Sequence, residues 1–337
     1  MTPTLLAPII ALHDRIRDSV VAACERQATE ELSAVDSEDA TDTIYSIDRV
    51  SEEILVEGLE AIARKEPMVL IAEGLPNGSL TLPHGTSDAD CKWRVLVDPI
   101  DGTREIMYQK RSAWILTGVA PNNGDATRVR DIMLAVQTEI PILKQHAGDQ
   151  LWAERGQGAN GIRFNRLTGE QTPLSLRPSR ATTLAHGFAS VSRFFPGARD
   201  VLAAIDDEII SETLGPAVAG KAACFEDQYL STGGQFYELI AGHDRFIADI
   251  RPLLKPIHAQ RGIPMPLCCH PYDIATALIA EELGIVLTNG IGGPIDAPLD
   301  VHSDVSWAGY ANASLRAAVE PALHNALRRR GLLPVGT

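Results

Sequence analysis

The chain has 337 residues, of which 45% are hydrophobic and 22% are charged. Such a chain can bury a large core, and its length allows two domains or one large layered unit. The 44 Asp and Glu outnumber the 30 Lys and Arg, so the formal net charge is -14. A protein this acidic repels nucleic acid and anionic membranes, and we expect neither as a partner.

The N-terminal residues and the cysteines indicate the cellular location of the protein. Residues 1–10 are apolar but lack a basic n-region, and charges follow at Asp14 and Arg15, so neither a signal peptide nor a membrane span fits. Five cysteines form no C-x-x-C pair and leave an odd count. This pattern favours reduced thiols over a disulfide framework or a zinc site. We therefore expect a cytoplasmic protein.

Helical periodicity marks the first part of the chain. Apolar residues recur every three or four positions over about residues 3–32, and again from near Ser46 to just before Pro67. This spacing predicts two amphipathic helices that lie on the body of the protein. Residues 33–43 between them are polar and acidic, and we expect a loop there. Asp48 then sits in the first turn of the second helix.

From residue 68 the pattern changes to short apolar runs, which predict β-strands. The runs are Met68 to Ala72, Trp93 to Val97, Ala113 to Ala120, Ile132 to Val136 and Gln150 to Ala153. The segment from Leu75 to Cys91 is rich in Gly, Pro and Ser and reads as a loop, and Asn122-Asn123-Gly124 is a turn signal. Helices followed by consecutive strands indicate the α+β class.

After about residue 180, predicted helices and strands alternate. We expect helices at Asp200 to Leu214, Gly233 to Ala241, Asp273 to Leu283 and Ala313 to Arg329, and a strand at Ile285 to Thr288. The 23 residues between Asp249 and Asp273 contain five prolines, which forbid a continuous helix and predict a long surface loop. We divide the chain into an N-terminal α+β subdomain, residues 1–178, and a C-terminal α/β subdomain, residues 179–337.

Two carboxylates emerge where a buried strand must turn sharply. Asp98-Pro99-Ile100-Asp101-Gly102-Thr103 follows the apolar run that starts at Trp93. Such a turn can aim Asp98, the Ile100 carbonyl and Asp101 at one point, and oxygen ligands of this kind suit Mg²⁺. Gly102 and Thr103 can present backbone N–H groups to a phosphate if a helix starts there. The alternative is a plain turn, because Asp, Pro and Gly all favour turns for local reasons.

Two more acids occupy comparable positions. Glu73 closes another apolar strand run, and Asp273 starts a helical pattern that is apolar through Ile274 and Leu278. Each has a simpler interpretation, Glu73 as a solvated loop acid and Asp273 as a helix cap. Taken together with the hexapeptide, they predict one metal site.

The order of these motifs resembles the inositol monophosphatase family, within the metal-dependent, lithium-sensitive phosphatase superfamily that includes fructose-1,6-bisphosphatase. The matching motifs are Asp48 with Glu52, Ile71-Ala72-Glu73, Asp98 to Thr103 as D-P-I-D-G-T, Gly156 to Ala159, Tyr272 to Ala275 as W-D-x-A, and Ala311-Asn312. The resemblance implies a layered αβαβα sugar-phosphatase fold of the α+β class. It also implies Mg²⁺-dependent hydrolysis of a small phosphate monoester, such as an inositol monophosphate or a sugar phosphate, by a homodimer.

The resemblance also implies roles for individual residues. Two or three Mg²⁺ ions would be held by Glu73, Asp98, the Ile100 carbonyl, Asp101 and Asp273. Thr103, hydrogen-bonded to Asp48, would position the attacking water and help deprotonate it, and Glu73 would assist through a third, weaker metal. Gly102 and Thr103 would contact the phosphate. Two positions depart from the family pattern, since Gly74 stands where a second acid is common and Tyr272 replaces the usual Trp.

The stretch before Asp273 is far longer than in inositol-specific members, and Asp249 is the nearest candidate for their sugar-binding acid. This stretch carries a basic cluster, Arg251, Lys255, His258 and Arg261. The cluster predicts that the stretch, through Arg251 and Arg261 in particular, binds a second anionic group on the substrate. The alternative is a solvated loop whose charges face water.

Two other functions remain open at this point. One is a bisphosphate phosphatase acting on fructose-1,6-bisphosphate or 3'-phosphoadenosine 5'-phosphate. The other is a non-catalytic, metal-binding regulatory protein that kept the fold. A serine hydrolase is not predicted, because Ser190 and Ser231 have no glycine elbow around them.

Overall fold

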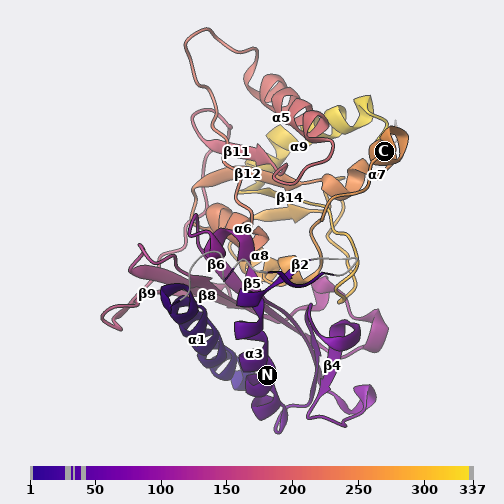
Figure 1. Cartoon of the computed structure of the whole chain (residues 1–337). Helices are drawn as coiled ribbons and strands as arrows, with labels where there is room; N and C mark the ends of the chain where they lie inside the picture. The colour runs from indigo at the N-terminus through magenta and orange to yellow at the C-terminus, as the bar shows by residue number, and fades with distance from the viewer. Residues whose placement is uncertain (1–2, 27–31, 33–34, 39–42, 334–337) are drawn as a thin grey trace.

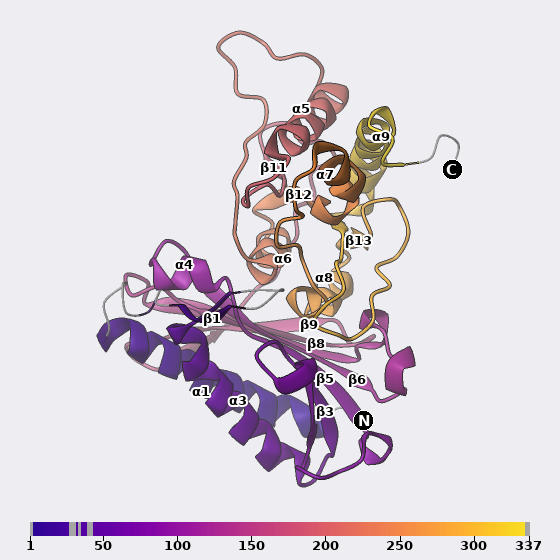
Figure 2. The ribbon, with the colours of Figure 1, turned by 45° about the vertical axis from the view of Figure 1, so that its right-hand side comes forward.

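The computed structural model describes residues 3–26, 32, 35–38 and 43–333. Helices and sheets alternate in five layers, so the order through the molecule is helix, sheet, helix, sheet, helix (Figures 1 and 2). Within the described part of the chain, no helix combines the length and the apolar character needed to cross a bilayer. The predicted α+β class and layered arrangement are confirmed.

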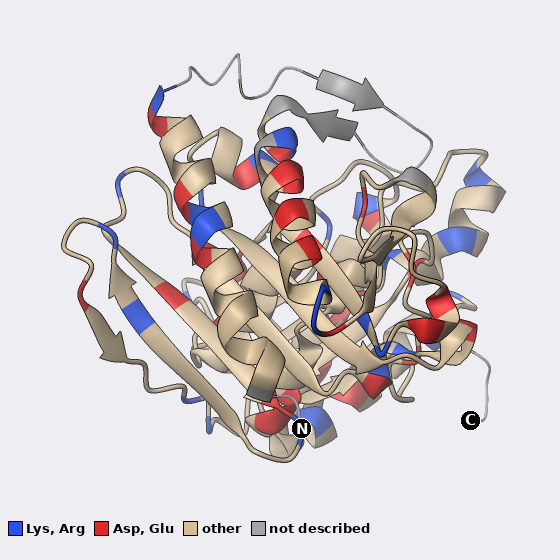
Figure 3. Ribbon diagram, turned by 90° about the horizontal axis from the view of Figure 1, so that it is seen from below, with Lys and Arg blue, Asp and Glu red and all other residues tan. Residues whose placement is uncertain are grey.

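Helices α1 (Pro3–Arg26) and α3 (Ser46–Ala63) form the first layer. They lie side by side across one face of the larger sheet, with charged residues on their outer faces (Figure 3). The apolar stripe that predicted α1 is buried from Leu5 to Val20. His13 on α1 is also buried, and its ring nitrogens lie 2.9 Å from the Thr138 hydroxyl and 2.8 Å from the Thr117 hydroxyl of the sheet. Residues 27–31, predicted to continue the first helix, lie outside the described residues.

The predicted loop over residues 33–43 is wrong in part. Val35–Glu38 forms strand β1 and pairs antiparallel with β2 (Thr43–Tyr45). This pairing uses backbone hydrogen bonds, so it needs no apolar alternation and leaves no signal in the sequence pattern. The remaining residues of that predicted loop, 33–34 and 39–42, are outside the described part.

The larger sheet has eight strands in the order β10-β9-β8-β7-β6-β5-β3-β4. Only the β3–β5 pair is parallel. The strands are β3 (Met68–Ile71), β4 (Ser79–Leu82), β5 (Trp93–Asp101), β6 (Ala113–Pro121), β7 (Leu134–Ile140), β8 (Ala147–Glu154), β9 (Ala159–Asn165) and β10 (Gln171–Pro173). All five predicted strands of this region exist. Sequence analysis missed β9 and β10, and it placed β4 in a loop.

The smaller sheet has the order β11-β12-β14-β13, from strands β11 (Phe188–Val191), β12 (Asp244–Asp249), β13 (Val286–Thr288) and β14 (Trp307–Tyr310). Helices α6 (Thr232–Ile240) and α8 (Ala277–Glu282) fill the layer between the sheets, and α5 (Arg199–Leu214) and α9 (Ala313–Arg329) cover the outer face (Figure 2). One apolar core runs between the two sheets, and a second lies under α1 and α3. The division at residue 178 stays a prediction.

The segment from Asp249 to Asp273 is not the predicted surface loop. It contains a 3-10 turn (Arg251–Leu254) and helix α7 (Lys255–Arg261), and Asp249, Arg251 and His258 are buried. The prolines of the first half, including Pro252, stand at the first positions of these helices, where the missing N–H costs no hydrogen bond. The helix predicted from Asp273 is also interrupted. A 3-10 turn (Tyr272–Ile274) precedes α8.

Candidate functional site

The ends of two parallel strands create the site. β3 and β5 run in register, with Ile71 beside Leu96, so the residues that follow them reach the same edge of the sheet. Glu73 follows β3. At the end of β5, Asp98 pairs with Leu116 and Asp101 with Trp114, so the register shifts by one residue. A bulge of this kind redirects side chains, and it brings both acids to one cavity.

Asp101 is held by the N-terminus of α6. Its carboxylate accepts hydrogen bonds from the Ser231 hydroxyl at 2.9 Å, the Gly233 N–H at 2.5 Å and the Thr232 N–H at 3.3 Å. A Cβ on Gly233 would lie 2.9 Å from this carboxylate and 2.5 Å from Leu116, so glycine permits the approach. Burial raises the pKa of Asp101 to about 6, although the three hydrogen bonds act in the opposite direction.

Asp98, which is buried, and Asp273, which is half-buried, complete a group of three carboxylates. Oxygen atoms of Asp98, Asp101 and Asp273 lie within 4.8 Å of one another. Asp98 accepts from the Ile100 N–H at 3.0 Å, and Asp273 from the His270 N–H at 2.6 Å. Burial, and then repulsion from the neighbouring carboxylates, raises the pKa of Asp98 well above its usual value. Asp273 is shifted in the same direction, also chiefly by burial.

Thr103 lies beside these acids at the start of the short helix α4 (Thr103–Met107). Its hydroxyl oxygen is 2.9 Å from the Asp48 carboxylate of α3 and 2.9 Å from the Ile100 carbonyl. The structure therefore contains the Thr103–Asp48 hydrogen bond that the family resemblance implied. Burial, and then the carboxylates of Glu73, Asp273 and Asp98, raise the pKa of Tyr272, the residue that replaces Trp, well above its usual value.

One cavity collects most of the predicted residues. Its lining includes Glu73, Asp98, Ile100, Asp101, Gly102, Thr103 and Asp273. It also includes Tyr272 of the matched W-D-x-A motif, and residues that no motif predicted: Arg104, Phe194, Phe195, Leu230, Ser231, Thr232, Leu267, Cys268 and Cys269. Most of these come from distant parts of the chain, and no spacing in the sequence links them to the acids.

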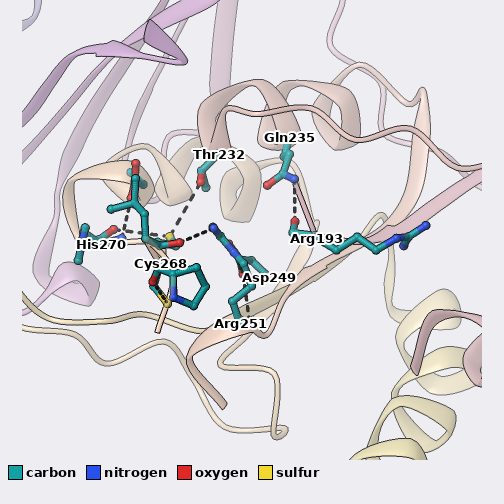
Figure 4. Close-up of polar contacts among 12 residues, drawn as sticks. Arg193, Thr232, Gln235, Asp249, Arg251, Cys268 and His270 are labelled. Atoms are coloured by element: carbon teal, nitrogen blue, oxygen red, sulfur yellow. Dashed lines mark hydrogen bonds and ion pairs between the residues drawn. The ribbon is translucent and has the colours of Figure 1, made fainter. Parts of the chain in front are cut away.

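Of the residues predicted to bind substrate, some lie outside the cavity lining, and Arg251 is already paired with another residue of the chain. Arg251 lines the cavity, but it is 4% exposed and forms a buried ion pair with fully buried Asp249 (Figure 4). Its Nε and Nη2 donate to the Asp249 carboxylate at 2.8 and 2.5 Å, and its Nη1 donates to the Leu267 carbonyl at 2.6 Å. Arg261 binds Asp200 at the surface. Neither Asp249 nor Arg261 is among the residues that line the cavity.

Two other matched motifs serve packing. In the turn that follows β8, the Gly156 and Gly158 N–H groups donate to the Glu282 carboxylate at 2.7 and 2.8 Å, which ties the turn to α8. Asn312 caps α9 by accepting from the Leu315 N–H at 3.0 Å. Both contacts lie outside the cavity lining, so these motifs fix the scaffold around the site.

No protein-family model matches the chain, and no curated protein sequence matches it. Solved structures do. Fructose-1,6-bisphosphatase of Leishmania major in holo form gives a TM-score of 0.67 at 16% identity over 96% of this chain and 94% of that one. The extragenic suppressor protein SuhB of Bartonella henselae gives 0.65 at 17% identity, over 95% and 98%. An IMPase of Thermotoga maritima gives 0.61 at 17% identity, over 96% and 98%.

Each of these structural alignments covers nearly the whole length of this chain and of the compared chain. They establish that the chain has the fold shared by inositol monophosphatase and fructose-1,6-bisphosphatase structures. The fold expected from the D-P-I-D-G-T signature and its companion motifs is confirmed.

Proposed function

We propose that this chain is a Mg²⁺-dependent phosphatase that hydrolyses a phosphate monoester of a small metabolite. The observation that carries the proposal is the group of Asp98, Asp101 and Asp273, whose oxygens lie within 4.8 Å of one another in the cavity that Glu73 also lines. The shared fold supports it, because the compared structures include a fructose-1,6-bisphosphatase and an IMPase.

The residues present fit a hard divalent cation. Carboxylate oxygens and a backbone carbonyl are the ligands that Mg²⁺ prefers, and it usually leaves some positions to water and substrate phosphate. Burial raises the pKa of all three aspartates, which means that the folded chain alone disfavours their charged forms. A bound cation would reverse that preference. Glu73, Asp98, the Ile100 carbonyl, Asp101 and Asp273 would hold the ions.

Bound divalent ions would supply positive charge to the phosphate oxygens and lower the pKa of a coordinated water. Residues of the chain would position the attacking water, the Asp101 carboxylate and the phosphate. Asp48 accepts the Thr103 hydroxyl hydrogen bond, so the Thr103 oxygen keeps lone pairs with which to accept a hydrogen bond from the attacking water. The α6 N-terminus fixes the Asp101 carboxylate. Gly102 and Thr103, which line the cavity, would contact the phosphate.

The test is release of inorganic phosphate from a panel of monoesters by the purified protein, with Mg²⁺ and with EDTA. The panel holds an inositol monophosphate, a hexose monophosphate and the two bisphosphates named above. Turnover of at least one ester only with Mg²⁺ supports the proposal. A protein that binds Mg²⁺, measured by its melting temperature, but turns over none of them would favour the regulatory alternative.

Two further parts of the proposal concern the protein as a whole. We propose that the chain forms a homodimer, as the sequence resemblance implies. Sedimentation of the purified protein would check this. The cytoplasmic location also stays a prediction, and cell fractionation of the native protein would check it.

A further inference from the structure

The cavity that holds the acids also has an aromatic wall. Phe194 and Phe195 line it, and both side chains are half-buried. Their ring centroids are 5.1 Å apart, and the ring planes meet at 84°. This is edge-to-face geometry, which aromatic pairs favour because the ring edge is positive and the face negative.

The wall forms where two parallel strands end. β11 and β12 pair in parallel, with Val191 beside Ala248, so the segments that follow them leave the same edge of the smaller sheet. Phe194 and Phe195 follow β11, and Arg251 follows β12. In open sheets with parallel strands, ligands bind at such carboxyl ends.

Arg251 supports both rings. Its guanidinium carbon lies 4.4 Å from the centroid of Phe194 and 5.3 Å from that of Phe195. The guanidinium cannot turn freely, because Asp249 and the Leu267 carbonyl hold its fork. Cation–π contacts of this kind gain strength when they are desolvated. Arg251, which the sequence pattern assigned to a second anionic group on the substrate, therefore serves with Asp249 as a rigid base for the aromatic wall.

The backbone of the wall is fixed as well. Arg199 donates from Nε to the Phe195 carbonyl at 2.8 Å and from Nη2 to the Phe194 carbonyl. Gly197 has a φ of +116°, and a Cβ there would lie 2.9 Å from the buried His258 ring. The turn is thus held between α5 and α7, and the two rings present a preformed surface.

We propose that Phe194 and Phe195 are specificity-determining residues, and that they favour phosphate esters whose leaving group carries a flat aromatic ring over esters of polyols. This inference rests on the proposed phosphatase function. The rings supply apolar surface in a cavity that is otherwise lined by carboxylates, hydroxyls, thiols, leucine side chains and the guanidinium groups of Arg104 and Arg251. A flat leaving group would bury apolar area and make ring contacts there. Polyol hydroxyls against the same rings would lose their hydrogen bonds to water.

The test compares benzyl phosphate with glycerol 1-phosphate, since both release a primary alcohol. The wild-type protein with Mg²⁺ should show the higher kcat/KM for benzyl phosphate. Phe194→Leu and Phe195→Leu keep apolar volume but remove the flat ring, and each should lower the ratio of the two kcat/KM values by about 5- to 10-fold. Equal losses for both esters, or an unchanged ratio, would overturn the inference.

Phe188→Leu is the matched control, because Phe188 lies on β11 and contacts Phe225 outside the cavity. It should leave the ratio unchanged, and melting temperatures show that each variant is folded. Binding of benzylphosphonate, which cannot be hydrolysed by this route, is measured by calorimetry with Mg²⁺ present. Should the wild-type protein turn over no ester, the phosphatase proposal fails. The specificity proposal is then tested by binding alone: Phe194→Leu should weaken the binding of benzylphosphonate more than the binding of 2,3-dihydroxypropylphosphonate.

Discussion

Asp249, which lies outside the cavity lining beside Arg251, and the carboxylates that line the cavity differ in what balances their charge. Asp249 is fully buried against Arg251, whose guanidinium donates to both of its oxygens. Asp98 is buried too, but the charged groups that act on it most are other carboxylates. A buried charge with a matched partner is balanced within the protein, whereas clustered like charges require a cation from solution. The Asp249–Arg251 pair therefore supports the shape of the cavity, whereas the clustered carboxylates are suited to binding cations.

The largest expected effect comes from breaking the clustered set. We predict that Asp98→Asn abolishes phosphate release, a loss on the order of 10⁴-fold or more, because this carboxylate is one of the proposed cation ligands. The change removes charge with little change in shape. The measurement is turnover at saturating Mg²⁺, with Asp200→Asn at the surface as the matched control. Equal turnover in Asp98→Asn and wild type would remove Asp98 from the metal site.

A smaller loss is expected where the site positions water rather than holding cations. Thr103→Ala should lower kcat by ~10²–10⁴-fold, the usual range for assistance in proton transfer, because Asp48 loses its hydrogen bond to the hydroxyl. The concentration of Mg²⁺ at half-maximal activity should change little. Thr103→Ser, which keeps the hydroxyl, should recover most of the rate. A variant that loses Mg²⁺ affinity but turns over normally when saturated would contradict this role.

Breaking the matched pair should reduce stability. We expect Arg251→Met to lower the free energy of unfolding by about 3–5 kcal/mol, because it leaves the Asp249 carboxylate buried without a cation. Urea denaturation measures the loss. Asp249→Asn in the same chain should recover part of it, since no charge then remains buried. If the single and double variants are equally stable, the pair contributes nothing through charge balance.

The smallest expected effect is a pH-dependent difference in melting temperature between Asp98→Asn and the wild-type protein. Asp98 binds its proton more tightly in the folded chain than in the unfolded one, because burial raises its pKa. Its contribution therefore favours folding at acid pH and is lost as the pH rises above about 4. In EDTA, Asp98→Asn should match the wild-type melting temperature near pH 4 and exceed it by about 5 °C at pH 7. Adding Mg²⁺ should raise the wild-type value more than that of the variant.

The grouping of the acids in one place could be predicted because their signals are local. Asp98 and Asp101 stand within one hexapeptide, and Glu73 ends an apolar run in the same way as Asp98. The wall could not be predicted, because Phe194 reaches the cavity through the parallel pairing of β11 with β12. No periodicity in the sequence records which strands become neighbours. Ser231 was considered only as a nucleophile, because the sequence does not record that the N-terminus of α6 packs against Asp101.

Errors in the fold prediction also have physical causes. The prolines from Pro252 to Pro271 predict a surface loop, yet Pro252 and Pro256 start helical turns, where proline is well tolerated. Strand β4 lies between Gly and Pro residues, and pairs with β3 at the edge of the sheet. Amphipathic helices such as α9 were predicted well, since burial of one face imposes a period that survives in the sequence.

The residues that hold the acids in place tolerate less substitution than the side chains of the aromatic wall. Gly233 has no space for a side chain beside Asp101, so variation there would disturb the group of carboxylates. The turn that carries Phe194 and Phe195 is held through its backbone carbonyls by Arg199, so its side chains can be exchanged while those bonds persist. Selection acting on this turn could therefore give descendants of this protein new substrates while their chemistry stays the same.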